Sequence, residues 1–167
     1  MTPLSSADHL ALGTALAQAS APADLYRAVD SLLAQRLGFG LFTAMVLTPD
    51  GQQVRRVYST DPKAYPLAGL KQMGPTPWGD LVLRRRECFV GSDAAAIRWA
   101  FPDHELIASL GLGSVINVPV LAFGQVLGTM NLLDAEGRYG DADLPLAREV
   151  APYLIAPFLR ELAAKAA

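Results

Sequence analysis

The sequence of 167 residues has a single cysteine, Cys88, and only two histidines, His9 and His104. One cysteine excludes an internal disulfide and agrees with a reducing, cytoplasmic location. Histidines in separate segments, without a cysteine cluster, exclude the usual zinc sites, so we expect no metal and no cofactor. A phosphate-binding loop is also missing, because Gly38-Phe39-Gly40 leads into a predicted strand rather than a helix.

The chain has no excess of charge either. Its formal net charge is −2 at pH 7, which gives no electrostatic reason to expect a nucleic-acid partner. Polar residues and proline break the longest apolar region, so no membrane span is expected, and the first ten residues do not resemble a secretory signal. Hydrophobic residues still make up 51% of the sequence. We therefore expect a single domain, residues 1–167, with extensive burial or a subunit interface.

The longest apolar region reads as a β-hairpin. Two strand-like segments, Ser114–Leu121 and Val126–Leu133, flank a turn that contains Gly124. Their nearly continuous apolar residues indicate strands that are buried on both faces of a sheet.

Four residues interrupt that apolar pattern: Asn117, Pro119, Thr129 and Asn131. All have odd numbers, so each pair lies on one face of its own strand. A loop of three or five residues places Asn117 opposite Asn131, whereas a loop of two or four breaks the match. We favour the odd loop, because the polar atoms of a buried sheet then gather on one face.

The other predicted elements surround this hairpin. In order they are helices over 5–20 and from Pro22 to Leu37, strands Phe39–Leu47 and Gln53–Ser59, a long connection over 60–80, a helix Pro77–Arg86, a strand Cys88–Val90, and helices Ala94–Phe101, Asp103–Leu110 and from Asp141 onward. Arg55 and Arg56 are expected near the wet side of their strand. Pro152 and Pro157 should kink or break the last helix.

The hairpin sequence Ser-Val-Ile-Asn-Val-Pro-Val, a short turn, and Gly-Gln-Val-Leu-Gly-Thr-Met-Asn-Leu-Leu resembles the last hairpin of GAF domains. The resemblance implies an α/β (α+β) fold: a GAF-like antiparallel β-sheet with the N- and C-terminal helices on one face and inserted helices and loops over the other. Residues 1–20 would then be a helical extension and residues 21–165 the core. The family arrangement also implies a pocket between the sheet and the insertions.

Seven residues are candidates for binding a small molecule in such a pocket. Aromatic walls with a few fixed polar groups are typical of ligand sites. The candidates are Trp78, Asp93, Trp99, Phe101, Asn117, Thr129 and Asn131. Because they offer amides and hydroxyls, a neutral or weakly polar ligand is expected. The alternatives are that the tryptophans anchor short helices to the sheet and that the amides are satisfied by water, by each other or by loop backbone. For Asp103, capping of the helix that begins at His104 is the favoured role.

Three functions stay open. The first is a non-catalytic, small-molecule-binding sensor or regulatory domain, and the second is a protein-interaction module with a collapsed pocket. The third follows from Phe101-Pro102-Asp103-His104, which resembles a Phe-Pro-Gly-His motif of the free methionine-(R)-sulfoxide reductases within the same family. Their cysteines are missing here, and their substrate-holding acidic residues would fall at Val115, Asn131 and Leu133, so no catalytic residue is expected. The Ala/Leu-rich terminal helices predict a homodimer.

Overall fold

The computed structural model describes residues 2–72 and 75–164. Its centre is an antiparallel sheet with the strand order β3-β2-β1-β6-β5-β4. The strands are β1 (Leu41–Leu47), β2 (Gln53–Ser59), β3 (Leu70–Gln72), β4 (Phe89–Gly91), β5 (Ser114–Ala122) and β6 (Gln125–Asp134). The predicted final hairpin, β5–β6, therefore lies inside the sheet. Its strands are buried over most of their length, which explains their continuous apolar sequence.

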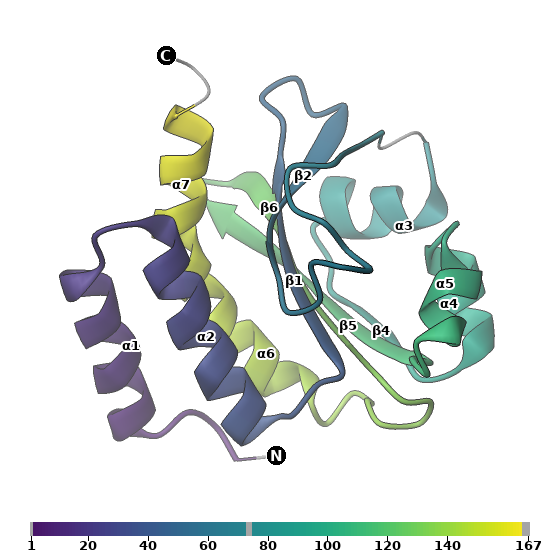
Figure 1. Ribbon diagram of the computed structural model, residues 1–167, viewed down its shortest axis with the longest axis horizontal. Helices are drawn as coiled ribbons and strands as arrows, with labels where there is room; N and C mark the ends of the chain where they lie inside the picture. The colour runs from purple at the N-terminus through teal and green to yellow at the C-terminus, as the bar shows by residue number, and fades with distance from the viewer. Residues whose placement is uncertain (1, 73–74, 165–167) are drawn as a thin grey trace.

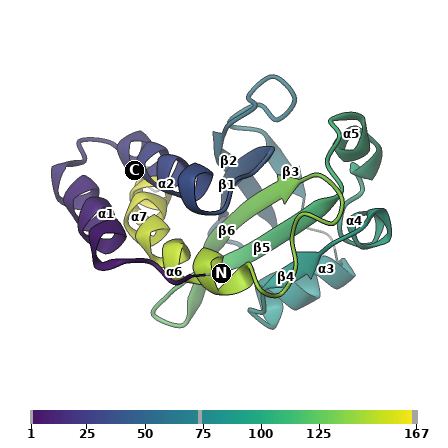
Figure 2. The ribbon, with the colours of Figure 1, turned by 90° about the horizontal axis from the view of Figure 1, so that it is seen from below.

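The terminal helices cover one face of the sheet, as Figures 1 and 2 show. The helices next to the sheet are α2 (Pro22–Arg36), α6 (Leu144–Val150), η2 (Ala151–Leu154) and α7 (Ile155–Ala163), and α1 (Ser6–Gln18) packs against α2 as an outer layer. The even-numbered residues of the central strands, such as Phe42, Ile116 and Leu132, pack with these helices in the largest hydrophobic cluster. Burying large side chains at this layer supplies much of the driving force for folding, at about 25 cal/mol per Å² of apolar surface.

The inserted segments cover the opposite face. They are α3 (Pro77–Gly79), η1 (Asp80–Arg84), α4 (Ala94–Ala100) and α5 (His104–Ser109). Odd-numbered strand residues such as Leu41, Val115 and Leu133 meet Ile97 and Ile107 of these insertions in a second, smaller cluster. The predicted two-sided architecture is therefore confirmed. The predicted helix Pro77–Arg86 differs in detail, because its second half is a π-helical turn, a geometry that is frequent at functional sites.

The helix ends mostly follow their local signals. Ser5 caps α1 in a reciprocal capping box with Asp8, and Gly38 ends α2 with a φ of 74° while its amide donates to the Leu33 carbonyl. The final helical stretch, expected from Asp141 onward, begins at Leu144, with Asp143 at the N-cap position. It breaks into a 3-10 segment around Pro152, as predicted. No helix in the described part of the chain is both long and apolar enough to cross a bilayer.

Two β-bulges set the register of the central strands. The β5–β6 turn is only two residues long, Phe123-Gly124, which corrects the predicted odd loop. A register shift follows at once, because Leu121 pairs with Val126 whereas Val120 pairs with Gly128. The extra residue on β6 restores the parity, so Asn117 still lies opposite Asn131. On β2 a second shift lies between the pairs Ala44–Tyr58 and Met45–Arg56.

Candidate ligand site between the sheet and the inserted segments

A row of polar side chains crosses the middle of the sheet on its insertion side. Thr43 of β1 pairs in register with Asn131 of β6, which pairs with Asn117 of β5. All three side chains are at least 95% buried. Strands this apolar keep polar side chains only where partners satisfy them, because an unpaired buried amide costs about 1–3 kcal/mol. These three residues are called the polar row below.

Hydrogen bonds join the polar row into a chain. The indole Nε1 of Trp78 donates to Asn117 Oδ1 at 2.9 Å, and Asn117 Nδ2 donates to Asn131 Oδ1 at 2.8 Å. Asn131 Nδ2 then reaches Thr43 Oγ1 at a longer 3.3 Å. Trp78 is 4% exposed, so the inserted helix α3 is fastened to the sheet through its indole. The polar row thus forms a floor whose hydrogen bonds are mostly internal, with the weakest one at Thr43.

A small cavity lies above this floor. Its volume is about 40 Å³, which is room for a few water molecules at about 10–15 Å³ each. The lining residues are Leu41, Thr43, Met45, Arg56, Tyr65, Phe101, Asp103, Ile107, Asn117, Asn131 and Leu133. This inner cavity therefore combines apolar walls, two amides, one hydroxyl of the floor, and a charged group of each sign.

Arg56, Tyr65 and Asp103 form the wall between the inner cavity and the outside. The Arg56 guanidinium carbon lies 4.9 Å from the centre of the Tyr65 ring, and its Nη1 donates to the Pro66 carbonyl at 3.1 Å. The Tyr65 hydroxyl donates to Asp103 Oδ2 at a long 3.3 Å. Burial and the Asp103 carboxylate raise the pKa of Tyr65, so its hydroxyl is neutral and donates. Burial lowers the pKa of Arg56, and Tyr65 and Asp103 partly offset that effect.

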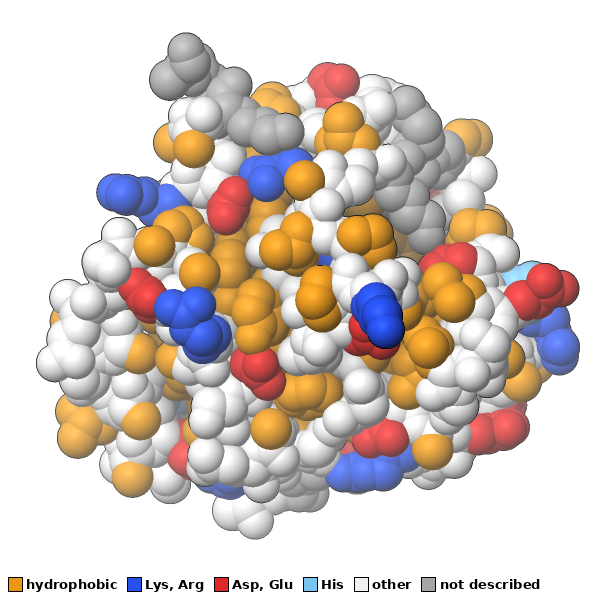
Figure 3. Space-filling model, viewed as in Figure 1, with side chains coloured by type: hydrophobic (Ala, Val, Ile, Leu, Met, Phe, Trp, Pro, Cys, Tyr) orange, Lys and Arg blue, Asp and Glu red, His pale blue; other side chains and the backbone are white. Residues whose placement is uncertain are grey.

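A larger groove lies on the other side of that wall. It has a volume of about 450 Å³ and is lined by β1 and β2, the connection after β2, and the residues around the start of α5. It shares Met45, Arg56, Tyr65 and Asp103 with the inner cavity. Two exposed apolar side chains line it, Leu70 at 54% and Leu106 at 39%, and Figure 3 shows hydrophobic groups interspersed with charged ones in this region. This space is called the outer groove.

The structure brings together five of the seven candidate residues. Asn117, Asn131 and Phe101 line the inner cavity, and Trp78 binds the floor. Thr129 is fully buried on the same face, one row along, between Met45 and Pro119 in register.

Two candidates lie outside the cavity. Trp99 is 47% exposed and packs on Phe89 with ring centres 5.1 Å apart. The Asp93 carboxylate accepts a hydrogen bond from the Ala96 amide at 2.8 Å and caps α4. The capping prediction for Asp103 was wrong, because its side chain makes no capping bond and faces Tyr65 instead.

Sequence reasoning missed Met45, Arg56 and Tyr65. Arg55 and Arg56 were both placed near the wet side, although consecutive strand residues point to opposite faces. Arg55 in fact faces the terminal helices, where it pairs with Glu161 at 2.9 Å, and Arg56 lines the cavity. Alternation alone was a usable signal for separating the two arginines. Tyr65 lies in a Pro-rich connection, where no periodic pattern exists.

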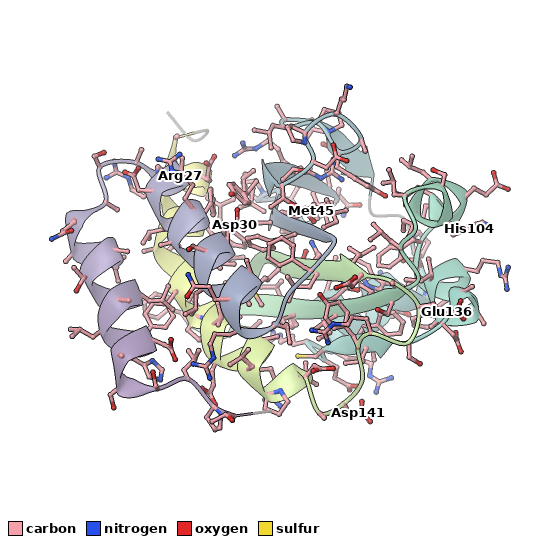
Figure 4. The ribbon with its side chains drawn as sticks, turned by 60° about the horizontal axis from the view of Figure 1, so that its bottom comes forward. Arg27, Asp30, Met45, His104, Glu136 and Asp141 are labelled. Carbon is pink, nitrogen blue, oxygen red and sulfur yellow. The ribbon has the colours of Figure 1, made fainter. Side chains whose placement is uncertain are left out.

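The chemistry of the site does not include a thiol or a metal cluster. Cys88 packs against the cluster on the helix side of the sheet, and burial raises the pKa of its thiol, an effect that Arg148 partly offsets. No group of three or more potential metal ligands occurs within residues 2–72 and 75–164. His104 lies at the far end of the inserted helices in Figure 4, with its Nδ1 3.2 Å from the Phe101 carbonyl oxygen.

Comparison with known proteins agrees with this architecture. Residues 19–154 match the sequence model of the GAF domain. The GAF domain of a phosphoenolpyruvate-protein phosphotransferase from Coxiella burnetii superposes with a TM-score of 0.74 at 15% identity, covering 96% of both chains. The corresponding domain from Acinetobacter gives 0.72 at 16% identity, over 96% of this chain and 97% of that one.

The GAF domain of a two-component sensor histidine kinase from Bacillus halodurans gives a TM-score of 0.70 at 13% identity, over 89% of this chain and all of that one. At these identities the similarity concerns the fold. No curated protein matches the sequence.

Proposed function

Because the chain belongs to the GAF domain family of small-molecule-binding sensory and regulatory domains, we propose that it senses a small molecule without catalysing a reaction. The ligand would occupy the inner cavity and extend into the outer groove. The similar structures include domains of a two-component sensor histidine kinase and of a methyl-accepting chemotaxis protein, which supports a role in signalling. The lone Cys88 supports a reducing, cytoplasmic setting.

One observation carries the proposal: the inner cavity and the outer groove share four lining residues, Met45, Arg56, Tyr65 and Asp103. The inner cavity alone is too small for a metabolite, since ligand sites usually occupy about 300–1,000 Å³. The outer groove, at about 450 Å³, is within that range. A shift of Tyr65 would join the two spaces into one site with a polar floor and apolar walls. Its 3.3 Å hydrogen bond to Asp103 is a weak restraint on such a shift.

The absence of catalysis is proposed from the site's chemistry. Reductases of the related kind need a nucleophilic thiol and a second thiol to resolve the intermediate. Cys88 lies on the helix side of the sheet, away from the cavity. Asp103 and Tyr65 are the titratable acids along the inner cavity, and both are engaged with neighbours.

A metabolite screen tests the proposal. The protein is incubated with a diverse library, and its thermal midpoint is measured for each compound, with native mass spectrometry of gently purified protein in parallel. A sensor should respond to one chemical class, and the shift should saturate with concentration, because ligand binding to the folded state stabilises it by mass action. Indiscriminate responses, or none across a well-sampled library, would contradict the sensor function.

A second candidate, a homodimerisation module, is supported by the bare surface of the terminal helices. Leu10 and Leu16 of α1 are 71% and 43% exposed, and Leu159 of α7 is 40% exposed. The outward face of α1 carries Leu10, Gly13, Thr14 and Ala17 without a charge. Sedimentation equilibrium distinguishes the cases: a dimer at micromolar concentration that Leu10→Gln dissociates supports the module, and a monomer removes it.

A further inference from the structure

The cavity face of the sheet carries two buried hydrogen-bond donors without a partner. Among the described residues, the buried side-chain atoms that lack a partner are Arg56 Nε, Thr129 Oγ1 and the Tyr26 hydroxyl. The first two belong to one row of the sheet, because Arg56 pairs with Met45 on one side and Met45 pairs with Thr129 on the other. Buried donors are normally satisfied. Two such donors in one row beside a cavity point to an acceptor that binds there.

Only Met45 separates these donors. Neighbouring strands lie about 4.8 Å apart, so Met45 occupies the gap between the Arg56 and Thr129 side chains. Met45 is partly buried, lines both the inner cavity and the outer groove, and lies near the middle of the molecule in Figure 4. Methionine is unbranched and changes rotamer easily. Turning its side chain aside would expose both donors to a ligand in the cavity.

The β2 bulge shows that this placement of Arg56 is built into the strand. Without the register shift, alternation from Tyr58 would put Arg56 on the helix side and Val57 over the cavity. With it, Val57 and Tyr58 both pack on the helix-side cluster, and Arg56 faces the cavity. Bulges commonly re-aim a side chain next to a functional site. The bulge therefore places the Arg56 guanidinium group on the cavity face of the sheet.

Resting on the proposed sensor function, we propose that the ligand is a monocarboxylate with a compact apolar body. Its carboxylate accepts hydrogen bonds from Arg56 Nε and Thr129 Oγ1 once Met45 moves. Arginine and hydroxyl donors together suit an anionic oxygen acceptor. The body lies against Leu41, Ile107 and Leu133 of the inner cavity and extends into the outer groove.

Asp103 restricts the charge of this ligand. Among the described residues that line the inner cavity, Asp103 is the one with a carboxylate. Its negative charge balances the positive charge of Arg56. A monocarboxylate brings one negative charge to Arg56, whose Nε still has a hydrogen bond to donate. A second negative charge would lie near Asp103, and like charges repel strongly at short range in a partly buried site. Dicarboxylates and phosphate esters are therefore excluded. This replaces the expectation of a neutral ligand, which considered the sheet-face amides and hydroxyls alone.

The test uses the full chain and isothermal titration calorimetry with defined probes. Hexanoate, benzoate and phenylacetate are compared with hexanamide, benzamide and phenylacetamide, which have the same bodies without the charge, and with succinate. At least one monocarboxylate should bind, and its amide should bind about 10- to 100-fold more weakly, as expected for loss of a charge-assisted hydrogen bond.

Two variants and a control locate the carboxylate. Arg56→Met should weaken binding of the acid about 10- to 100-fold and leave the amide unchanged, while Thr129→Val should weaken the acid about 2- to 10-fold. Thr129→Val is nearly isosteric and removes a hydroxyl without a partner, so it should fold even if Arg56→Met does not. Arg27→Gln removes an exposed arginine on α2 and should bind like the parent.

The outcomes separate the two proposals. Equal affinity for acid and amide, no effect of either cavity variant, or preferred binding of succinate would overturn the monocarboxylate inference and leave the sensor function standing. Binding of none of these probes, with a neutral compound found by the library screen, would do the same. Failure of both the probes and the library would overturn the inference and the sensor function together.

Discussion

Replacing Asn131 by leucine tests whether the polar row holds the structure together. Leucine suits a buried strand and is close to asparagine in length, so the change keeps the apolar pattern of β6. It removes the acceptor for Asn117 Nδ2 and the donor to Thr43 Oγ1, however. Both partners are at least 95% buried, so they cannot recover these bonds from bulk water.

The size of the effect follows from those contacts. Leaving Asn117 Nδ2 unpaired costs about 1–3 kcal/mol. The Thr43 hydroxyl adds less, because its bond is longer and the group can rotate toward another acceptor. The extra apolar surface of leucine offsets part of this loss. The net destabilisation should be about 1–3 kcal/mol, which lowers the melting temperature by about 2–12 °C for a chain of this size.

Urea titrations followed by circular dichroism measure this change, and a double-mutant cycle with Asn117→Leu tests the connection. The double variant replaces both partners by apolar groups, so it should be more stable than the sum of the two single changes predicts, by about 0.5–3 kcal/mol. Met130→Leu is the matched control: Met130 is the preceding residue, is fully buried, and faces the terminal helices. An Asn131→Leu protein as stable as the parent, or strict additivity in the cycle, would refute the reasoning.

Three further predictions concern other parts of the fold: two matched pairs of substitutions and one pH profile. A Cβ on Gly128 would lie 2.0 Å from the Met45 carbonyl oxygen, so Gly128→Ala should destabilise by about 3 kcal/mol in a urea titration, whereas Gly13→Ala in open space on α1 should stabilise by about 0.5–1 kcal/mol. Tyr26→Phe removes a buried hydroxyl without a partner among the described residues and should be neutral or stabilising; Tyr139→Phe breaks a 2.7 Å bond to the Gly38 carbonyl and should cost about 1 kcal/mol. Burial raises the pKa of four tyrosines, so the folded chain keeps protons that the unfolded chain releases above pH of about 10. The free energy of unfolding, measured by urea titration from about pH 8 to about pH 11.5, should therefore fall above about pH 10. A free energy that does not change with pH would contradict the burial of Tyr26, Tyr58, Tyr65 and Tyr139.

The sequence predicted the face of the sheet on which a side chain lies where that face follows from the alternation of residues along one strand. Odd numbering placed Asn117 and Asn131 on the insertion side, and both lie there. The predicted odd loop was nevertheless wrong, because the turn has two residues. A two-residue turn should have broken the match, and the bulge near Leu127 restored it. Bulges leave no reliable signature in an apolar run, because every nearby residue is equally suited to either register.

Roles that depend on contacts between distant segments were not predictable. Trp78 and Asn117 are 39 positions apart, and their hydrogen bond exists only because α3 lies across β5. Trp99 was a pocket candidate for the same reason as Trp78, because it is an aromatic residue of the inserted segments. In the structure α4 instead places it against Phe89 at the surface. The wall of Arg56, Tyr65 and Asp103 likewise joins a bulged strand, a loop and a helix start.

The floor and the wall of the site differ in how firmly they are held, and this difference determines which of them can move. The floor belongs to central strands, with paired backbones on both sides and short hydrogen bonds of 2.8 and 2.9 Å between its side chains and Trp78. The contacts of the wall include a long hydrogen bond, a cation–π contact and the hydrogen bond from Arg56 to the Pro66 carbonyl in an irregular connection. Segments with few backbone pairs open at lower free energy than core strands. A ligand should therefore enter by displacing Tyr65 and its connection while the sheet stays fixed, and the binding signal would leave through the 60–69 segment.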